Sequence, residues 1–258
     1  MRGRKYLYAI FAMLVMAGIG SAAVLPMVGV DIPVRSKYVW RGAVFNTDPV
    51  LWPDAWINWF GFTFCAWGSM DLTDVKEKQL SLTDLALFLD YTRPVGPVTP
   101  TVGFALYNYP GSAYGDAFPT TGEVYAKVSG SLGVLQAALN LNYDVMEAKG
   151  LYVSPSITKV LPLGPVALSL TLSGGFADGN HNVYYYGLDK TCFTDLTAVL
   201  KLTFTPSGPL AKWLMISADI DYAMLIDSEL ADLVETYGDS KNIYGGGGIG
   251  IYYLFGGE

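Results

Sequence analysis

The stretch Leu161–Ser173, LPLGPVALSLTLS, joins a Pro-x-Gly-Pro tetrapeptide to a strictly alternating run. From Val166 to Ser173, valine and leucine alternate with alanine, serine and threonine. A period of two indicates a β-strand with one apolar face and one polar face. Because proline fixes φ and glycine accepts positive φ, the tetrapeptide predicts a sharp turn just before this strand.

The same tetrapeptide recurs at residues 94–97 and 206–209, each time between two amphipathic runs. Around the third copy, the alternation extends over Leu196–Phe204 before the turn and over Leu214–Tyr222 after it. The repeated turn therefore predicts several long antiparallel strands that are joined by tight reversals.

Composition places these strands in a membrane. The chain has 258 residues, of which 52% are hydrophobic and only 15% charged, with 18 Tyr, 12 Phe and 6 Trp. Beyond the N-terminal segment, no apolar run reaches the ~20 residues that a spanning helix needs. High apolar content spread over alternating strands is typical of a transmembrane β-barrel. A secreted soluble β-sandwich is a less favoured alternative to the barrel, because its strands would be shorter and its outer faces polar.

The N-terminal segment has the pattern of a secretory signal. Arg2, Arg4 and Lys5 precede an apolar run over residues 6–17, and Ser21-Ala22-Ala23 follows. We expect a signal peptide at residues 1–23 and the barrel at residues 24–258. All 23 acidic residues lie after this segment, which holds three of the 16 basic ones. This acidic balance argues against nucleic acid as a partner.

The alternation predicts an all-β, antiparallel up-and-down barrel of about twelve strands. Short turns and longer connections alternate along the chain, as they do in outer-membrane barrels, and the Pro-x-Gly-Pro turns all fall in the short class. The connection over residues 226–242 also predicts one short helix with Ser228 as its N-cap. The expected strands lie at residues 36–45, 54–60, 62–70, 83–93, 98–109, 121–131, 134–145, 150–161, 165–176, 193–205, 212–225 and 243–255.

Several segments of the sequence resemble those of a known family. They are SKYVWRG (Ser36–Gly42), DPVLWPDAWINW (Asp48–Trp59), FTFCAWGSMDLTD (Phe62–Asp74), GEVYAKVS (Gly122–Ser129) and LNYDV (Leu141–Val145). The chain resembles the TorF-like porins and related outer-membrane proteins of Gram-negative bacteria. The resemblance implies an outer-membrane barrel and a channel of unspecified substrate. The final strand also looks like a signal for the barrel-assembly machinery, so the expected partners are that machinery, outer-membrane lipid and small solutes.

Residues for catalysis or cofactor binding are sparse. The single histidine, His181, is expected in a solvated loop, and no serine stands in a nucleophile setting, so we expect no enzyme. Gly245–Gly250 matches G-x-G-x-x-G but lies inside the last strand, whereas a dinucleotide site needs a strand followed by a helix. Cys65 and Cys192 are expected as free thiols, and no cofactor or metal is expected.

The inward face of the strands is the candidate site. By alternation, eight acids and four bases are expected to line the lumen: Lys37, Arg41, Asp54, Asp84, Asp90, Glu123, Lys127, Asp144, Asp195, Lys201, Asp219 and Asp221. An open lumen of this charge predicts passive diffusion of small solutes with mild cation preference. Alternatively, the charges pair and close a barrel that has a structural or surface-interaction role. The turn near residue 208 predicts one such pair, Lys201 with Asp219.

Overall fold

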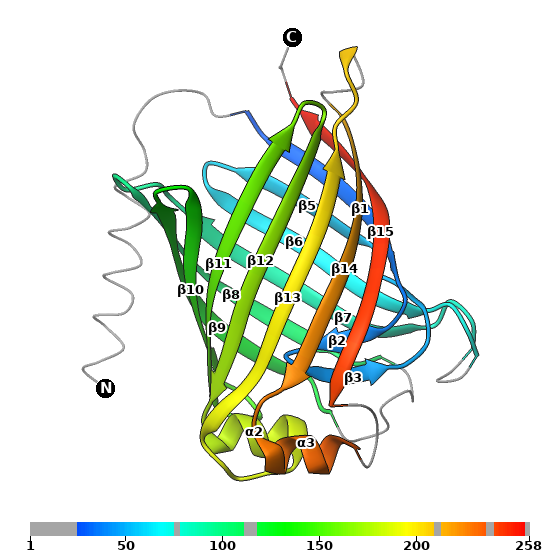
Figure 1. Cartoon of the computed structure of the whole chain (residues 1–258), viewed down its shortest axis with the longest axis vertical. Helices are drawn as coiled ribbons and strands as arrows, with labels where there is room; N and C mark the ends of the chain where they lie inside the picture. The colour runs from blue at the N-terminus through cyan, green and yellow to red at the C-terminus, as the bar shows by residue number, and fades with distance from the viewer. Residues whose placement is uncertain (1–24, 75–77, 111–117, 209–212, 236–239, 256–258) are drawn as a thin grey trace.

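The computed structural model describes residues 25–74, 78–110, 118–208, 213–235 and 240–255. They form a closed antiparallel barrel of twelve strands (Figure 1). β4 and β5 count as one position, because both lie between β1 and β6. The strands of the wall are β1 (Met27–Arg35), β4 (Val50–Leu51), β5 (Asp54–Trp59), β6 (Phe62–Asp71), β7 (Leu82–Thr92), β8 (Val98–Asn108), β9 (Thr121–Leu132), β10 (Leu135–Asp144), β11 (Leu151–Leu163), β12 (Val166–Ala177), β13 (Cys192–Phe204), β14 (Leu214–Leu225) and β15 (Lys241–Leu254).

The first strand lies elsewhere than predicted. The prediction of a wall strand at residues 36–45 is wrong, and β1 at Met27–Arg35 takes that place and keeps the number at twelve. Residues 36–45 instead contain a separate hairpin of β2 (Tyr38–Trp40) and β3 (Ala43–Asn46). Arg41 and Gly42, with φ of 48° and 82°, form its two-residue turn, which a continuous strand would not contain.

The barrel closes where β1 meets β15. Their ladder runs without a shift from Met27 opposite Leu254 to Arg35 opposite Gly246. Closure pairs the backbone groups of what would otherwise be two edge strands. The G-x-G-x-x-G match lies within β15, as expected.

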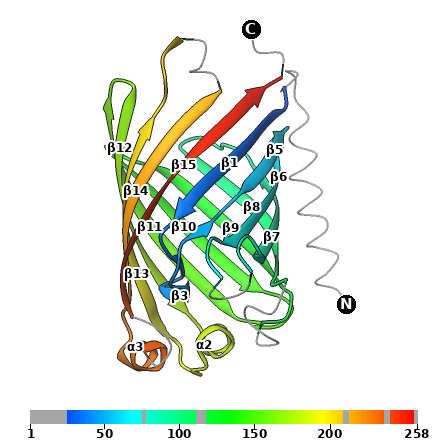
Figure 2. The same ribbon diagram turned by 90° about the vertical axis from the view of Figure 1, so that its right-hand side faces the viewer.

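The two ends of the barrel differ. One end carries the tight turns, and Gly96, Gly164 and Gly208 there have φ of 60°, 69° and 73°, as predicted for the three Pro-x-Gly-Pro copies. The other end carries the longer connections with helices α2 (Gly179–Tyr186) and α3 (Ser228–Glu235), seen at the bottom of Figures 1 and 2. We call these the turn end and the loop end.

Both helices begin at an aspartate. The predicted helix at residue 228 is confirmed, but Asp227 rather than Ser228 caps it, since Asp227 Oδ1 accepts from the backbone N–H of Glu229 at 3.1 Å and Leu230 at 3.3 Å. Helix α2 was not predicted; its N-cap Asp178 accepts from the N–H of His181. Within the described ranges, neither this helix pair nor any other helical segment has the length and apolarity needed to cross a membrane.

The outer face of the wall is apolar. Large exposed side chains follow every second position, for example at Val30, Ile32 and Val34 in β1, whereas the residues between them face inward. Such a belt suits hydrocarbon, and the closed ladder rules out the soluble β-sandwich. Cys65 and Cys192 are free, as predicted. The signal peptide expected at residues 1–23 lies outside the described residues.

Candidate functional site

The barrel encloses a cavity of about 900 Å³. Strand β7 shows how the alternating sequence lines it, because every second residue faces the cavity: Asp84, Ala86, Phe88, Asp90 and Thr92. Strands β6, β8, β9, β10 and β11 contribute in the same way. The lining therefore mixes carboxylates, amides and hydroxyls with aromatic rings, as ligand-binding cavities do.

The hairpin β2–β3 lies inside the barrel and bounds this cavity. Tyr38, Val39, Trp40, Arg41 and Phe45 of the hairpin segment all line it, together with the barrel wall. Polar residues near the loop end are almost fully inaccessible to solvent: Glu123 is 1% exposed, and Asp144, His181 and Asn182 are 0% exposed. The described residues thus fill the loop end of the lumen, and the cavity extends from the hairpin toward the turn end.

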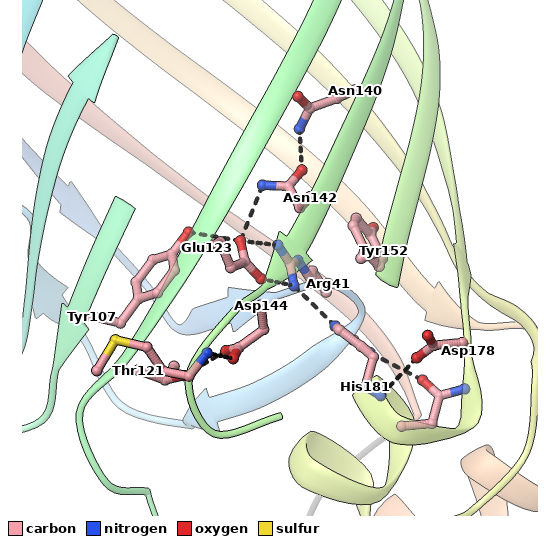
Figure 3. A network of polar contacts seen from close by, with 12 residues as sticks. Arg41, Tyr107, Thr121, Glu123, Asn140, Asn142, Asp144, Tyr152, Asp178 and His181 are labelled. Atoms are coloured by element: carbon pink, nitrogen blue, oxygen red, sulfur yellow. Dashed lines mark hydrogen bonds and ion pairs between the residues drawn. The ribbon is translucent and has the colours of Figure 1, made fainter. Parts of the chain in front are cut away.

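Arg41 fastens the hairpin to the wall (Figure 3). Its Nη1 and Nη2 each lie 2.8 Å from one oxygen of Glu123 on β9, which makes a bidentate ion pair. Its guanidinium also lies 4.1 Å from the ring centres of Trp40 and Tyr152. Burial lowers the pKa of Arg41, but the charge of Glu123, the hydrogen bonds to it and the nearby tyrosines together outweigh burial and raise the pKa. Arg41 therefore stays charged and paired.

The carboxylate of Glu123 has further partners in the same network (Figure 3). Tyr107 donates its hydroxyl to Oε2 at 3.2 Å, and the amide of Asn142 donates to the same oxygen at 3.0 Å. A buried carboxylate with this many donors is well satisfied. Breaking the pair from the Arg41 side would leave the charge of the buried Glu123 uncompensated, which is costly.

His181 belongs to this network, and the expectation of a solvated loop histidine is wrong. Helix α2 places its ring 0% exposed, 5.3 Å from the ring of Tyr152 and with Nε2 2.9 Å from Arg41 Nη1. Burial, and then the charge of Arg41, lowers the pKa of His181 to about 3. Its Nδ1 lies 3.1 Å from Asn182 Oδ1, so a neutral ring donates there and accepts from Arg41 at Nε2.

The depressed pKa of His181 makes a pH prediction. The unfolded chain takes up a proton near pH 6.5 but the folded one near pH 3, so the folded state loses stability as pH falls through this window, by about 1.4 kcal/mol per unit. We expect His181→Gln to be less stable than wild type at pH 7 and to lose this disadvantage near pH 4.5. Thermal unfolding in detergent at both values measures it. The same difference in stability between variant and wild type at pH 7 and at pH 4.5 would contradict the lowered pKa of His181.

A second ion cluster spans the closing strands. Arg35 donates from Nη1 to Asp219 and from Nη2 to Asp221. Gly246 of β15 lies between them, opposite Arg35 on one side and Asp219 on the other. Because Gly246 has no side chain, the guanidinium can cross the intervening strand to reach β14.

The predicted pair of Lys201 with Asp219 is wrong, although its register is right. The two residues lie directly opposite each other in β13 and β14. Asp219 nevertheless pairs with Arg35, and the described part of the chain contains no Lys201–Asp219 ion pair. Arg35 was missed because the first strand was placed too late. The alternation of Val30, Ile32 and Val34 was the signal that could have identified its inward position.

The twelve predicted lining residues divide into separate groups. Arg41, Asp84, Asp90 and Lys127 line the cavity. Glu123, Asp144 and Asp195 are buried near the loop end, and Asp219 and Asp221 pair with Arg35. Asp54 and Lys201 are half-buried on their strands, and Lys37, before the hairpin, donates to Asn242 at 3.2 Å. Lys37 and Arg41 thus come from the inserted segment rather than from a wall strand. The aromatic rings around the cavity are the part of the site that the charges alone did not reveal.

No protein family model matches the chain, and no curated protein matches it in sequence. Solved structures match in fold. The NanC porin is 12% identical, with 88% of this chain and 98% of that chain covered and a TM-score of 0.52. An outer membrane channel from Pseudomonas putida F1 is 10% identical, with coverages of 90% and 97% and a TM-score of 0.53. At these identities the likeness concerns the barrel fold.

Proposed function

We propose that this protein is an outer-membrane porin through which small solutes diffuse passively. The observation that carries the proposal is the cavity of about 900 Å³, lined by polar and aromatic side chains inside a wall whose outer face is apolar. Two proteins of the same fold are named as a porin and an outer membrane channel, which supports it. The resemblance to TorF-like porins points the same way.

The same proposal covers location and partners. The apolar outer belt fits outer-membrane lipid, and β15 is the strand that the barrel-assembly machinery would recognise. We infer no enzymatic role, because the ring nitrogens of His181 face Arg41 and Asn182 instead of a serine. Recovery of the protein in the outer-membrane fraction, with a gel mobility that shifts on boiling, supports this placement; recovery as a soluble protein would refute it.

Single-channel recording in a planar bilayer tests the channel itself. A porin gives discrete current steps, whereas a barrel with a purely structural role gives none. That second function is favoured by one observation, namely that the hairpin and its partners fill the loop end of the lumen. The hairpin-replacement variant described in the Discussion separates a narrow pore from a closed one.

Cation preference is the finer part of the proposal, and two cavity residues test its sign. We expect Asp90→Asn to weaken the cation preference, because it removes a negative charge from the cavity. Lys127→Gln should strengthen the preference, because it removes a positive charge from the same cavity. The two variants serve as each other's matched controls. Reversal potentials in a salt gradient measure both, and unchanged values in the two variants would show that the conducting path avoids this cavity.

A further inference from the structure

Two charged side chains of opposite sign are open to solvent inside the cavity. Four charged residues of the described part of the chain line it. Two of them are covered, because Arg41 is bound to Glu123 and Asp84 is only 2% exposed. Lys127, by contrast, is exposed and Asp90 is half-buried. A solute inside the cavity can therefore reach a carboxylate and an ammonium group of the wall.

Asp90 and Lys127 lie near each other on the wall, but they do not pair. Thr92 on β7 is opposite Thr101 on β8, which is opposite Lys127 on β9. Asp90 lies two residues from Thr92 on the same face of β7. Two residues along a strand and two strands across, at ~3.3 Å and ~4.8 Å each, place the Cα atoms of the two charged residues roughly 12 Å apart. No ion pair joins these two described residues.

The ring of Tyr125 lies flat on the wall between these charges. Its hydroxyl donates to Oδ2 of Asp90 at 3.0 Å, although β8 separates β9 from β7. The ring crosses β8 at Gly103, where a Cβ would lie 2.5 Å from Cζ of Tyr125. Because Gly103 has no side chain, the ring rests on the backbone and turns its other face to the cavity that it lines. The hydrogen bond holds the ring in place and occupies only one of the two oxygens of Asp90.

We propose that this part of the cavity binds a zwitterionic amino acid with an apolar side chain. Its ammonium group pairs with Oδ1 of Asp90, and its carboxylate pairs with Lys127. Its side chain packs on the ring of Tyr125 and on Phe88, which precedes Asp90 by two residues and also lines the cavity. The ring face favours the ammonium group as well.

The charges of the wall favour a zwitterion over a simple ion. A cation satisfies only Asp90 and an anion satisfies only Lys127, whereas a zwitterion satisfies both and brings no net charge into the cavity. The cavity of about 900 Å³ is of the size that holds small-molecule ligands, so it has room for an amino acid.

The site deepens the proposed function and rests on it, because solutes reach the cavity through the lumen. It identifies the preferred solutes as amino acids rather than simple salts. Binding itself requires no conduction, however, so the amino-acid site and the porin can fail separately in experiment.

The experiment is equilibrium dialysis of the purified protein, in a nonionic detergent, against radiolabelled leucine. Two competitors each lack one charge of leucine: 3-methylbutylamine has no carboxylate, and 4-methylpentanoate has no ammonium group. Sodium chloride keeps the ionic strength constant. We expect leucine to bind at least about fivefold more tightly than either competitor, because each competitor loses one charge-assisted hydrogen bond.

Each charge of the wall is tested by a variant and a matched control. Asp90→Asn keeps an acceptor for the Tyr125 hydroxyl; it should lower the affinity for leucine about fivefold and should not weaken 4-methylpentanoate. Lys127→Gln should lower the affinity for leucine about fivefold and should not weaken 3-methylbutylamine. The controls Asp54→Asn and Lys201→Gln remove half-buried charges of the wall that do not line the cavity, and they should bind leucine as wild type does.

Leucine that binds no more tightly than one of its competitors overturns the site, and so does unchanged leucine binding in Asp90→Asn or Lys127→Gln. A control that loses as much binding as its counterpart also overturns it. If one of the two variants lacks the boiling-dependent mobility of a folded barrel, the other variant and the competitors decide. Leucine binding without bilayer current keeps the site and removes the porin, and current without leucine binding does the reverse.

Discussion

Replacing Tyr38–Asn46 with a glycine–serine linker of the same length should raise single-channel conductance several-fold. These residues form the inserted hairpin that bounds the cavity, and Arg41 at its tip is fixed to Glu123 and His181. A glycine–serine linker makes none of these contacts and stays flexible, so the loop end of the lumen would open. Planar-bilayer recording of the variant beside wild type measures the change.

The hairpin variant needs a control at the same end of the barrel. Glu229→Ala in helix α3 removes an ion pair with Lys190 in which the Glu229 side chain is 63% exposed, and it leaves the hairpin untouched. We expect wild-type conductance from it, since exposed pairs contribute little. Unchanged conductance in the hairpin variant would mean that the hairpin does not limit the path.

Gly246→Ala should prevent most of the protein from reaching the closed barrel. A Cβ at this position would lie 2.2 Å from the backbone oxygen of Val34 and about 3 Å from the side chain of Arg35. The backbone of β1 would have to move away from β15, and Arg35 would lose its route to Asp219. Overpacking costs ~1–3 kcal/mol and breaking a buried ion pair ~3–5 kcal/mol, so we expect a loss of at least about 3 kcal/mol.

The folded fraction on unboiled gels and urea unfolding in detergent measure this loss. Gly174→Ala in β12 is the matched control, because its Cβ would meet only Asp195 O at 3.7 Å, an ordinary contact. It should fold as wild type does. A Gly246→Ala protein as stable as that control would show that β1 and β15 do not pack this closely at position 246.

The positions of most wall strands could be predicted from the sequence, because each wall strand has lipid on one face and the lumen on the other. Lipid outside and the lumen inside impose a period of two, which β7 and β12 follow closely and which located their turns to within a few residues. The hairpin segment carries strand-forming residues too, so alternation alone could not tell a wall strand from an inserted one. The Arg41–Gly42 turn was the local signal against a continuous strand.

Helix α2 and the ion pairs could not be predicted from the sequence, because both depend on contacts between distant parts of the chain. Residues 179–186 include few strong helix formers, and burial of His181 and Tyr185 against the hairpin network holds the helix in place. The alternation correctly predicted that Asp219 faces inward. Its partner Arg35 lies 184 residues away and is reached only because the sheet closes into a barrel.

The contact of β1 with β15 also determines how the protein survives once it is made. Met27 and Leu254 become neighbours only after the ten intervening wall strands are in order, which makes closure a slow, non-local event. Unfolding requires the whole hydrogen-bonded ladder between two strands to separate at once, because a closed barrel has no free edge strand at which separation could start. We therefore expect the protein's persistence to be set by its unfolding rate, so that its lifetime far exceeds what its equilibrium stability alone would give.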